Sequence, residues 1–181
     1  MEKNIDLTDI SESNTINNSN DNLEDSSIYI LSKEDKGINN KDFLNYAKEA
    51  LEISKLDIHN YSPLVLAYMG DAVYELIIRS KITAIGNVQV KKMHKQSAEL
   101  VKAAAQAKMS ELISVILTEE ETAVYKRGRN AKSSTMAKNA SMIDYRMATG
   151  FEALVGYLYL TEQFERLIEL VSFGLKKMGE N

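Results

Sequence analysis

An acidic residue stands alone inside each of two strongly apolar segments of the sequence. Asp71 lies in the segment Leu64–Tyr74 beside Gly70, and Glu152 lies in the segment Gly150–Leu158, which also contains glycine. A carboxylate that is buried without a partner is costly, so each of these needs a cation, a salt bridge or hydrogen bonds. A glycine within a helix costs about 1 kcal/mol relative to alanine and usually indicates close approach of another element. The two segments therefore predict two apolar helices, each with one carboxylate beside a site of close packing.

Two kinds of partner would satisfy these carboxylates. If the helices pack against each other, Asp71 and Glu152 could share a magnesium or manganese ion whose shell is completed by waters. An ion pair with Arg79, Arg146 or a lysine is the commoner arrangement, and spacing alone favours it. Glu75 follows Asp71 by four residues on nearly the same helical face. It is a candidate further ligand, although a partly exposed helical glutamate is the simpler interpretation.

Several other chemistries are excluded by residue type. The chain has no cysteine, so thiol nucleophiles, disulfides and thiolate metal sites are absent. Its two histidines, His59 and His94, are far apart in sequence, which argues against a zinc site of the usual kind. No Gly-rich nucleotide loop, serine nucleophile elbow or kinase motif occurs. What remains is hard-cation chemistry on carboxylates.

The basic residues are concentrated in the middle of the chain. The stretch 79–138 holds 12 lysines and arginines against 5 acidic residues, which indicates a polyanionic partner. Its densest part, Lys126–Ser134, combines cations, hydroxyls and a glycine, all suited to phosphate oxygens. Lys91 and Lys95 add a second basic face, on which His94 is expected to be a surface residue. The alternative is that both are merely solvated charges.

The first part of the chain has a different character. Residues 1–60 hold 13 acidic residues against 6 basic ones, although the whole chain has a formal net charge of -4. We interpret 1–40 as a disordered acidic extension and 41–181 as a helical domain. Folding of the extension over the basic surface is the alternative. The first residues lack the features of a secretory signal, and no apolar stretch approaches membrane-spanning length, so a cytoplasmic protein is expected.

Apolar periodicity predicts helices and no strands, and hence an all-α fold. Ser62 and Pro63 are typical of a helix start, Thr118 begins a capping box, Gly128 is expected to end the helix that follows, and Thr161 is expected to cap the last helix. Asp144 fits a first-turn position. The predicted helical segments are 41–55, 63–79, 88–117 as one helix or two, a helix from 119 that ends at Gly128 within the basic loop 126–132, 144–160 and 162–177.

Three motifs in this order resemble the Mini-ribonuclease III family. They are LAYMGDAVYE at 66–75, KRGRNAKS at 126–133 and FEALVGYLYL at 151–160. The resemblance covers roughly 62–175. It implies a ribonuclease III catalytic-domain helical fold, a homodimer, and a metal-dependent endoribonuclease that cleaves double-stranded RNA to leave 5′-phosphate and 3′-hydroxyl ends. It also implies maturation of the 23S ribosomal RNA precursor, with assistance from a ribosomal protein as a further expectation.

The resemblance carries residue roles over to this chain. Asp71 and Glu152 match the catalytic metal ligands, for which Mg²⁺ is expected and Mn²⁺ is a second suitable ion. Larger ribonuclease III enzymes have two more acids, where this chain has Ala67 and Thr149. The resemblance also implies that the family lacks a separate RNA-binding domain, so the basic surface is expected to bind the duplex through Lys91, Lys95, Lys126, Arg127, Arg129, Asn130 and Lys132.

Two functions of other classes compete with this one. A non-catalytic RNA-binding protein that assists ribosome assembly could use the same scaffold, but such a protein could lose Asp71 or Glu152 without losing its core. A helical interaction module that recruits a partner through the acidic extension leaves the basic segment unexplained.

Overall fold

The computed structural model describes residues 40–53, 57–132 and 141–180, and these residues contain helices and no strand. The all-α prediction is confirmed. The chain divides into two units, Met1–Tyr46 and Ala47–Asn181. The expected acidic extension, 1–40, lies outside the described residues except for Asn40 at the start of α2 (Asn40–Ala50). The predicted helix 41–55 is thus present, but it ends at Ala50.

The second unit is built around two long apolar helices, α3 (Pro63–Thr83) and α7 (Met142–Leu160). Ser62 caps α3, because its hydroxyl accepts a hydrogen bond from the Val65 amide, and Pro63 occupies the first turn as predicted. Ser141 caps α7 in the same way through the amide of Asp144, which confirms the first-turn position of that residue. Both helices are longer than predicted: α3 continues past Arg79 and buries Ile82, and α7 begins at Met142 because Ser141 caps it.

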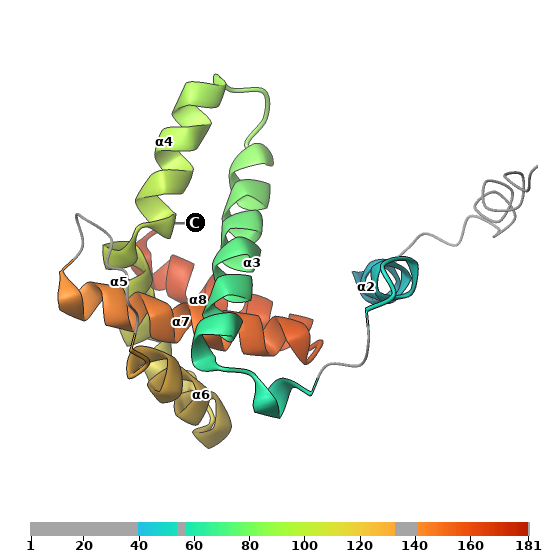
Figure 1. Cartoon of the computed structure of the whole chain (residues 1–181). Helices are drawn as coiled ribbons and strands as arrows, with labels where there is room; N and C mark the ends of the chain where they lie inside the picture. Colours follow the sequence, from blue (N-terminus) through green and yellow to red (C-terminus); the bar gives the residue numbers. More distant parts are fainter. Residues whose placement is uncertain (1–39, 54–56, 133–140, 181) are drawn as a thin grey trace, which may run out of the picture. The chain divides into compact units, whose positions relative to one another are not determined.

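The remaining helices surround this pair. The segment 88–117 forms two helices, α4 (Val90–Val101) and α5 (Ala103–Ile113), followed by the short η2 (Ser114–Ile116). The others are η1 (Ile58–Asn60), α6 (Glu119–Arg129) and α8 (Phe164–Met178). Figure 1 shows α3 and α4 running side by side and joined at the top of the view, with α7 crossing below them.

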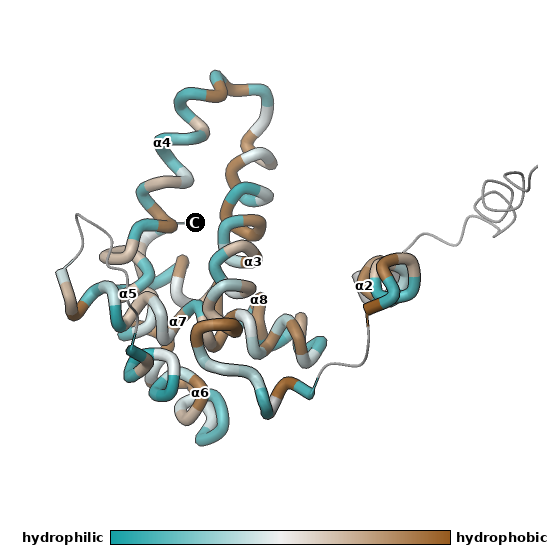
Figure 2. Tube along the Cα trace, viewed as in Figure 1, coloured by the Kyte–Doolittle hydropathy of each residue, from teal (hydrophilic) through white to brown (hydrophobic). Residues whose placement is uncertain are grey.

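Large apolar side chains from α3, α5, α7 and α8 form one core. Tyr74 and Phe151 are both buried and meet edge to face, with ring centroids 4.9 Å apart, at the centre of the α3–α7 contact. Figure 2 shows mostly hydrophilic and intermediate residues along α4 and α6, which border this core. The core therefore fixes α3 and α7 rigidly, and these are the helices that hold Asp71 and Glu152.

Two predicted helix ends are wrong. Gly128 does not stop α6, which continues to Arg129, because Gly128 is buried where α6 meets α7. Thr161 does not cap α8; its hydroxyl donates to the carbonyl of Tyr157 and closes the end of α7. The predicted capping box at Thr118 and Glu121 is confirmed. Glu121 is also bound by Arg166, and that hydrogen bond holds the pKa of the Glu121 carboxyl below its usual range.

Candidate active site

The backbones of α3 and α7 touch at a pair of glycines. A Cβ atom on Gly70 would lie 1.8 Å from the carbonyl oxygen of Glu152, and one on Gly156 would lie 2.0 Å from the carbonyl oxygen of Leu66. Both distances are far below any contact that real side chains make, so only glycine fits at either position. Gly70, which the sequence linked to close packing, therefore creates the helix crossing together with Gly156.

This crossing brings Asp71 and Glu152 together. Burial raises the pKa of the Glu152 carboxyl to about 7, and the nearby charge of Asp71 raises it further in the same direction. Asp71 is more exposed than Glu152, and partial desolvation raises the pKa of its carboxyl, with a smaller contribution from the charge of Glu75. Two neighbouring carboxyl groups whose pKa values are both raised form a site that would be stabilised by added positive charge.

No described residue supplies that charge through an ion pair. Arg79, expected as a possible partner, instead pairs with Glu75, with 2.5 Å between Nη2 and Oε1. Neither Asp71 nor Glu152 forms a salt bridge with Arg146 or with any lysine in the part of the chain that the structure describes. The ion pair that spacing alone favoured is therefore not formed with Arg79, Arg146 or any described lysine, and the other lysines lie outside the described residues.

Glu75 does not complete a three-carboxylate ligand set. Its side chain is partly exposed and is engaged by Arg79. Within residues 40–53, 57–132 and 141–180, no three acidic or histidine side chains gather as metal ligands. The structure thus favours the simpler interpretation of Glu75 as a partly exposed helical glutamate.

Gln106 is a polar residue at this site that the sequence analysis missed. It lies on α5, is 1% exposed, and its Nε2 has no hydrogen-bond partner among the described residues. The carboxamide is nevertheless near enough to Glu152 to lower the pKa of that carboxyl, against the larger effect of burial. The available signal was a single polar residue within Ala103–Ala107, but helical periodicity alone could not show what it faced.

The positions where larger ribonuclease III enzymes carry two more acids are buried here. Ala67 is part of the core, and the Thr149 hydroxyl donates to the carbonyl of Tyr145 one turn earlier in α7. Neither position contributes a carboxylate.

The basic segment is mostly helical rather than a loop. The last turn of α6 contains Lys126, Arg127 and Arg129, whose positive charges interact favourably with the helix dipole. Asn130 is the C-cap. The guanidinium of Arg129 lies over the Tyr125 ring, 5.9 Å from its centroid. Lys132 follows the helix and is exposed, and 133–140, including the end of the predicted basic segment, lie outside the described residues.

The second basic face lies on another helix. Lys91 and Lys95 are exposed on α4, which packs against α3 and α5, whereas α6 packs against α7 and α3. Figure 1 shows α4 and α6 at opposite ends of this view. The structure therefore does not join the seven predicted RNA-binding residues in one cluster.

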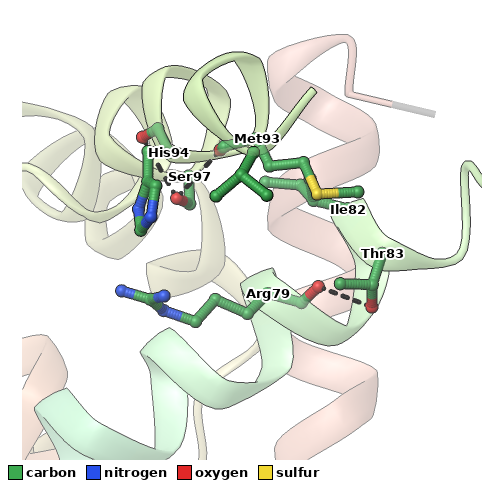
Figure 3. Close-up of a pocket in the computed structure, with 7 residues that line it drawn as sticks. Arg79, Ile82, Thr83, Met93, His94 and Ser97 are labelled. Carbon is green, nitrogen blue, oxygen red and sulfur yellow. Dashed lines mark hydrogen bonds between the residues drawn. The ribbon is translucent and has the colours of Figure 1, made fainter. Parts of the chain in front are cut away.

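His94 and Arg79 border a small pocket between α3 and α4. The pocket has a volume of about 140 Å³ and is otherwise lined by Ile82, Thr83, Val90, Met93 and Ser97. Figure 3 shows Arg79 and His94 extending from the two facing helices toward the same side of the pocket. The Ser97 hydroxyl donates to the carbonyls of Met93 and His94, so it is already satisfied within α4.

Residues 64–163 match the model of the ribonuclease III domain, and this match places the protein in the class of ribonuclease III enzymes. Similar relatives indicate a particular family within this class. A Mini-ribonuclease 3 from Enterococcus faecalis is 49% identical over 126 residues, covering 68% of this chain and 96% of the relative. One from Clostridium tetani is 53% identical over 131 residues, covering 72% and 87%. The chain therefore belongs to the Mini-ribonuclease III family and is an endoribonuclease.

A crystal structure supports the same fold. A protein from Fusobacterium nucleatum is 31% identical and superposes with a TM-score of 0.62, covering 68% of this chain and 99% of its own. In the described residues, none of the helices has the length and apolar character needed to cross a bilayer.

Proposed function

We propose that this protein is a divalent-metal-dependent endoribonuclease that cleaves double-stranded RNA, with Asp71 and Glu152 as the metal ligands. The observation that carries the proposal is the meeting of these two carboxylates at the Gly70–Gly156 crossing, without an ion-pair partner among the described residues. Membership of the Mini-ribonuclease III family supports the assignment.

The donor set fits a hard divalent cation. Asp71 and Glu152 offer carboxylate oxygens, which Mg²⁺ prefers, and Mg²⁺ commonly binds through one or two carboxylates with water and phosphate oxygens completing its shell. Mn²⁺ accepts the same ligands. A bound ion would activate water and neutralise the charge that develops on the phosphodiester.

The chain's own residues then have distinct tasks. Glu152 must be ionised to act as a ligand, and a pKa of about 7 means that it releases a proton when the site is loaded near neutral pH. Hydrolysis adds the oxygen of water to phosphorus and breaks the bond from phosphorus to the 3′-oxygen, which takes up a proton. The products carry 5′-phosphate and 3′-hydroxyl ends.

The exposed cations are proposed to hold the RNA backbone. Lys126 and Arg127 form no ion pair with any described residue, so both are available to phosphate oxygens. Lys91 and Lys95 on α4 could reach a separate part of the same duplex. A-form RNA offers phosphates and 2′-hydroxyls across a wide minor groove, and both are suited to such contacts.

A homodimer is proposed from the outer face of α3. Tyr68 is 82% exposed and Leu76 is 64% exposed, and the exposed Val65 lies on the same side of the helix. A second copy would cover these side chains and place two sites on one duplex, one for each strand.

The proposed physiological substrate is the 23S ribosomal RNA precursor, processed in the cytoplasm with assistance from a ribosomal protein. Its support is the family membership of the chain, since no side chain in the site distinguishes one duplex from another.

The test is cleavage of end-labelled duplex RNA in Mg²⁺ and in EDTA by the wild-type protein and by the Asp71→Asn and Glu152→Gln variants. Glu111→Gln, which alters an exposed carboxylate on α5, is the matched control. We expect metal-dependent cutting by the wild type and the control and none by the two site variants, all of which should remain folded and bind RNA. Duplex binding without cutting by the wild type would instead indicate a non-catalytic ribosome-assembly factor, and normal cutting by a site variant would exclude that ligand.

A further inference from the structure

Gln106 occupies a position that packing alone does not explain. It lies on α5 between Ala105 and Ala107, and the other large side chains that α5 buries are those of Met109 and Ile113. A buried polar group is normally hydrogen-bonded, because burial removes its contacts with water. The Nε2 atom of Gln106 has no such partner among the described residues. An apolar side chain of similar size would fill the same space without burying an unpartnered donor. This indicates that the carboxamide has a role other than packing.

The surroundings of Gln106 identify the group that it serves. Helix α5 packs against α7, and the Gln106 side chain lies near the Glu152 carboxylate, although the two do not form a regular hydrogen bond in this structure. An amide N–H is a good donor to a carboxylate oxygen, and this interaction strengthens when the carboxylate is ionised. Glu152 has two oxygens, so one can accept from Gln106 while the other remains free for a cation.

We propose that Gln106 is a positioning residue that donates an N–H of its carboxamide to one oxygen of Glu152 and so orients the other oxygen toward the divalent cation shared with Asp71. The inference rests on the proposed function, because it assigns Gln106 to the same metal site. Residues that hydrogen-bond to metal ligands fix ligand orientation, and replacing them typically lowers metal affinity or activity by about 10- to 100-fold.

Gln106→Met separates this role from a structural one. Methionine is nearly isosteric and apolar, so it fills the same space while removing the donor. We expect the variant to melt near the wild-type temperature, since Nε2 of Gln106 forms no hydrogen bond with a described residue that the substitution would remove. Its affinity for Mn²⁺, measured by calorimetric titration in the absence of RNA, should fall by about 10-fold or more. Met109→Leu, at a buried position on the same helix, should bind Mn²⁺ like the wild type.

Unchanged Mn²⁺ affinity in Gln106→Met would overturn the proposal, whatever happens to the melting temperature. If that variant does not fold, Gln106→Asn gives the same test, because it keeps the amide but shortens its reach by one methylene. Failure of the proposed function is distinguishable: in that case wild-type protein itself binds no Mn²⁺, or Glu152→Gln binds it normally.

Discussion

Gly70 and Gly156 face each other across the α3–α7 crossing, and a Cβ atom on Gly70 would lie 2.7 Å from the backbone nitrogen of Gly156. This backbone contact sets the spacing of the two helices. Asp71 follows one glycine directly, and Glu152 precedes the other by one helical turn, so the glycines also set the spacing of the two carboxylates.

Gly70→Ala and Gly156→Ala should therefore impair both folding and catalysis. The added methyl group would overlap a backbone carbonyl oxygen, which cannot rotate away, so the helices must separate. We expect a loss of about 1–3 kcal/mol or more in the free energy of unfolding, measured by urea denaturation, and a drop in duplex cleavage. Ser80→Ala, at an exposed position of α3, should change stability by less than about 0.5 kcal/mol. Wild-type stability in Gly70→Ala would contradict the tight crossing.

The raised pKa of Glu152 predicts a pH-dependent stability of the metal-free protein. Its value of about 7 in the folded protein lies above the usual 4.5, so the folded state retains a proton that the unfolded state has lost between these two pH values. Stability should fall as pH rises from 4.5 through 7, by about 3 kcal/mol at most. Glu152→Gln should remove this loss. Urea denaturation in EDTA at pH 5 and pH 8 measures it, and equal pH slopes in the two proteins would refute it.

The basic end of α6 predicts a charge-dependent RNA affinity. Replacing Lys126 and Arg127 together by alanine should weaken duplex binding and reduce the slope of log affinity against log salt by up to about 2, because two phosphate contacts are lost. Fluorescence anisotropy with labelled duplex at several salt concentrations measures both quantities. The matched control replaces Lys176 and Lys177, two exposed lysines in the last turn of α8. An equal effect in the control would indicate a general charge effect and no specific site.

The apolar face of α3 predicts the dimer interface. Tyr68→Ala combined with Leu76→Ala should shift the protein toward monomer, because exposed aromatic and aliphatic side chains of this kind contribute about 2 kcal/mol or more at the centre of an interface. Sedimentation velocity across a range of concentrations reports the change. Ile168→Ala alters a half-exposed residue on α8 and should leave the association unchanged. A monomeric wild-type protein would exclude the homodimer.

Local signals in the sequence determined much of the helical framework. Ser62 with Pro63 and Thr118 with Glu121 specify helix starts through hydrogen bonds that span only three residues, so no distant contact is needed to predict them. The apolar segments around Asp71 and Glu152 likewise indicated two buried helices and two candidate ligands, because carboxylates are expensive in such surroundings.

Relationships between helices were decided by the tertiary structure. Glycine often ends helices, yet Gly128 lies inside α6 at its contact with α7. Threonine often caps helix starts, yet the Thr161 hydroxyl bonds to the end of α7. Arg79 was a candidate partner for Asp71, but in the structure it pairs with Glu75, which lies four residues earlier in the same helix. The proximity of Asp71 to Glu152, and of Gln106 to Glu152, depends on which helix faces pack together. That choice follows from the whole core, because local periodicity does not encode it.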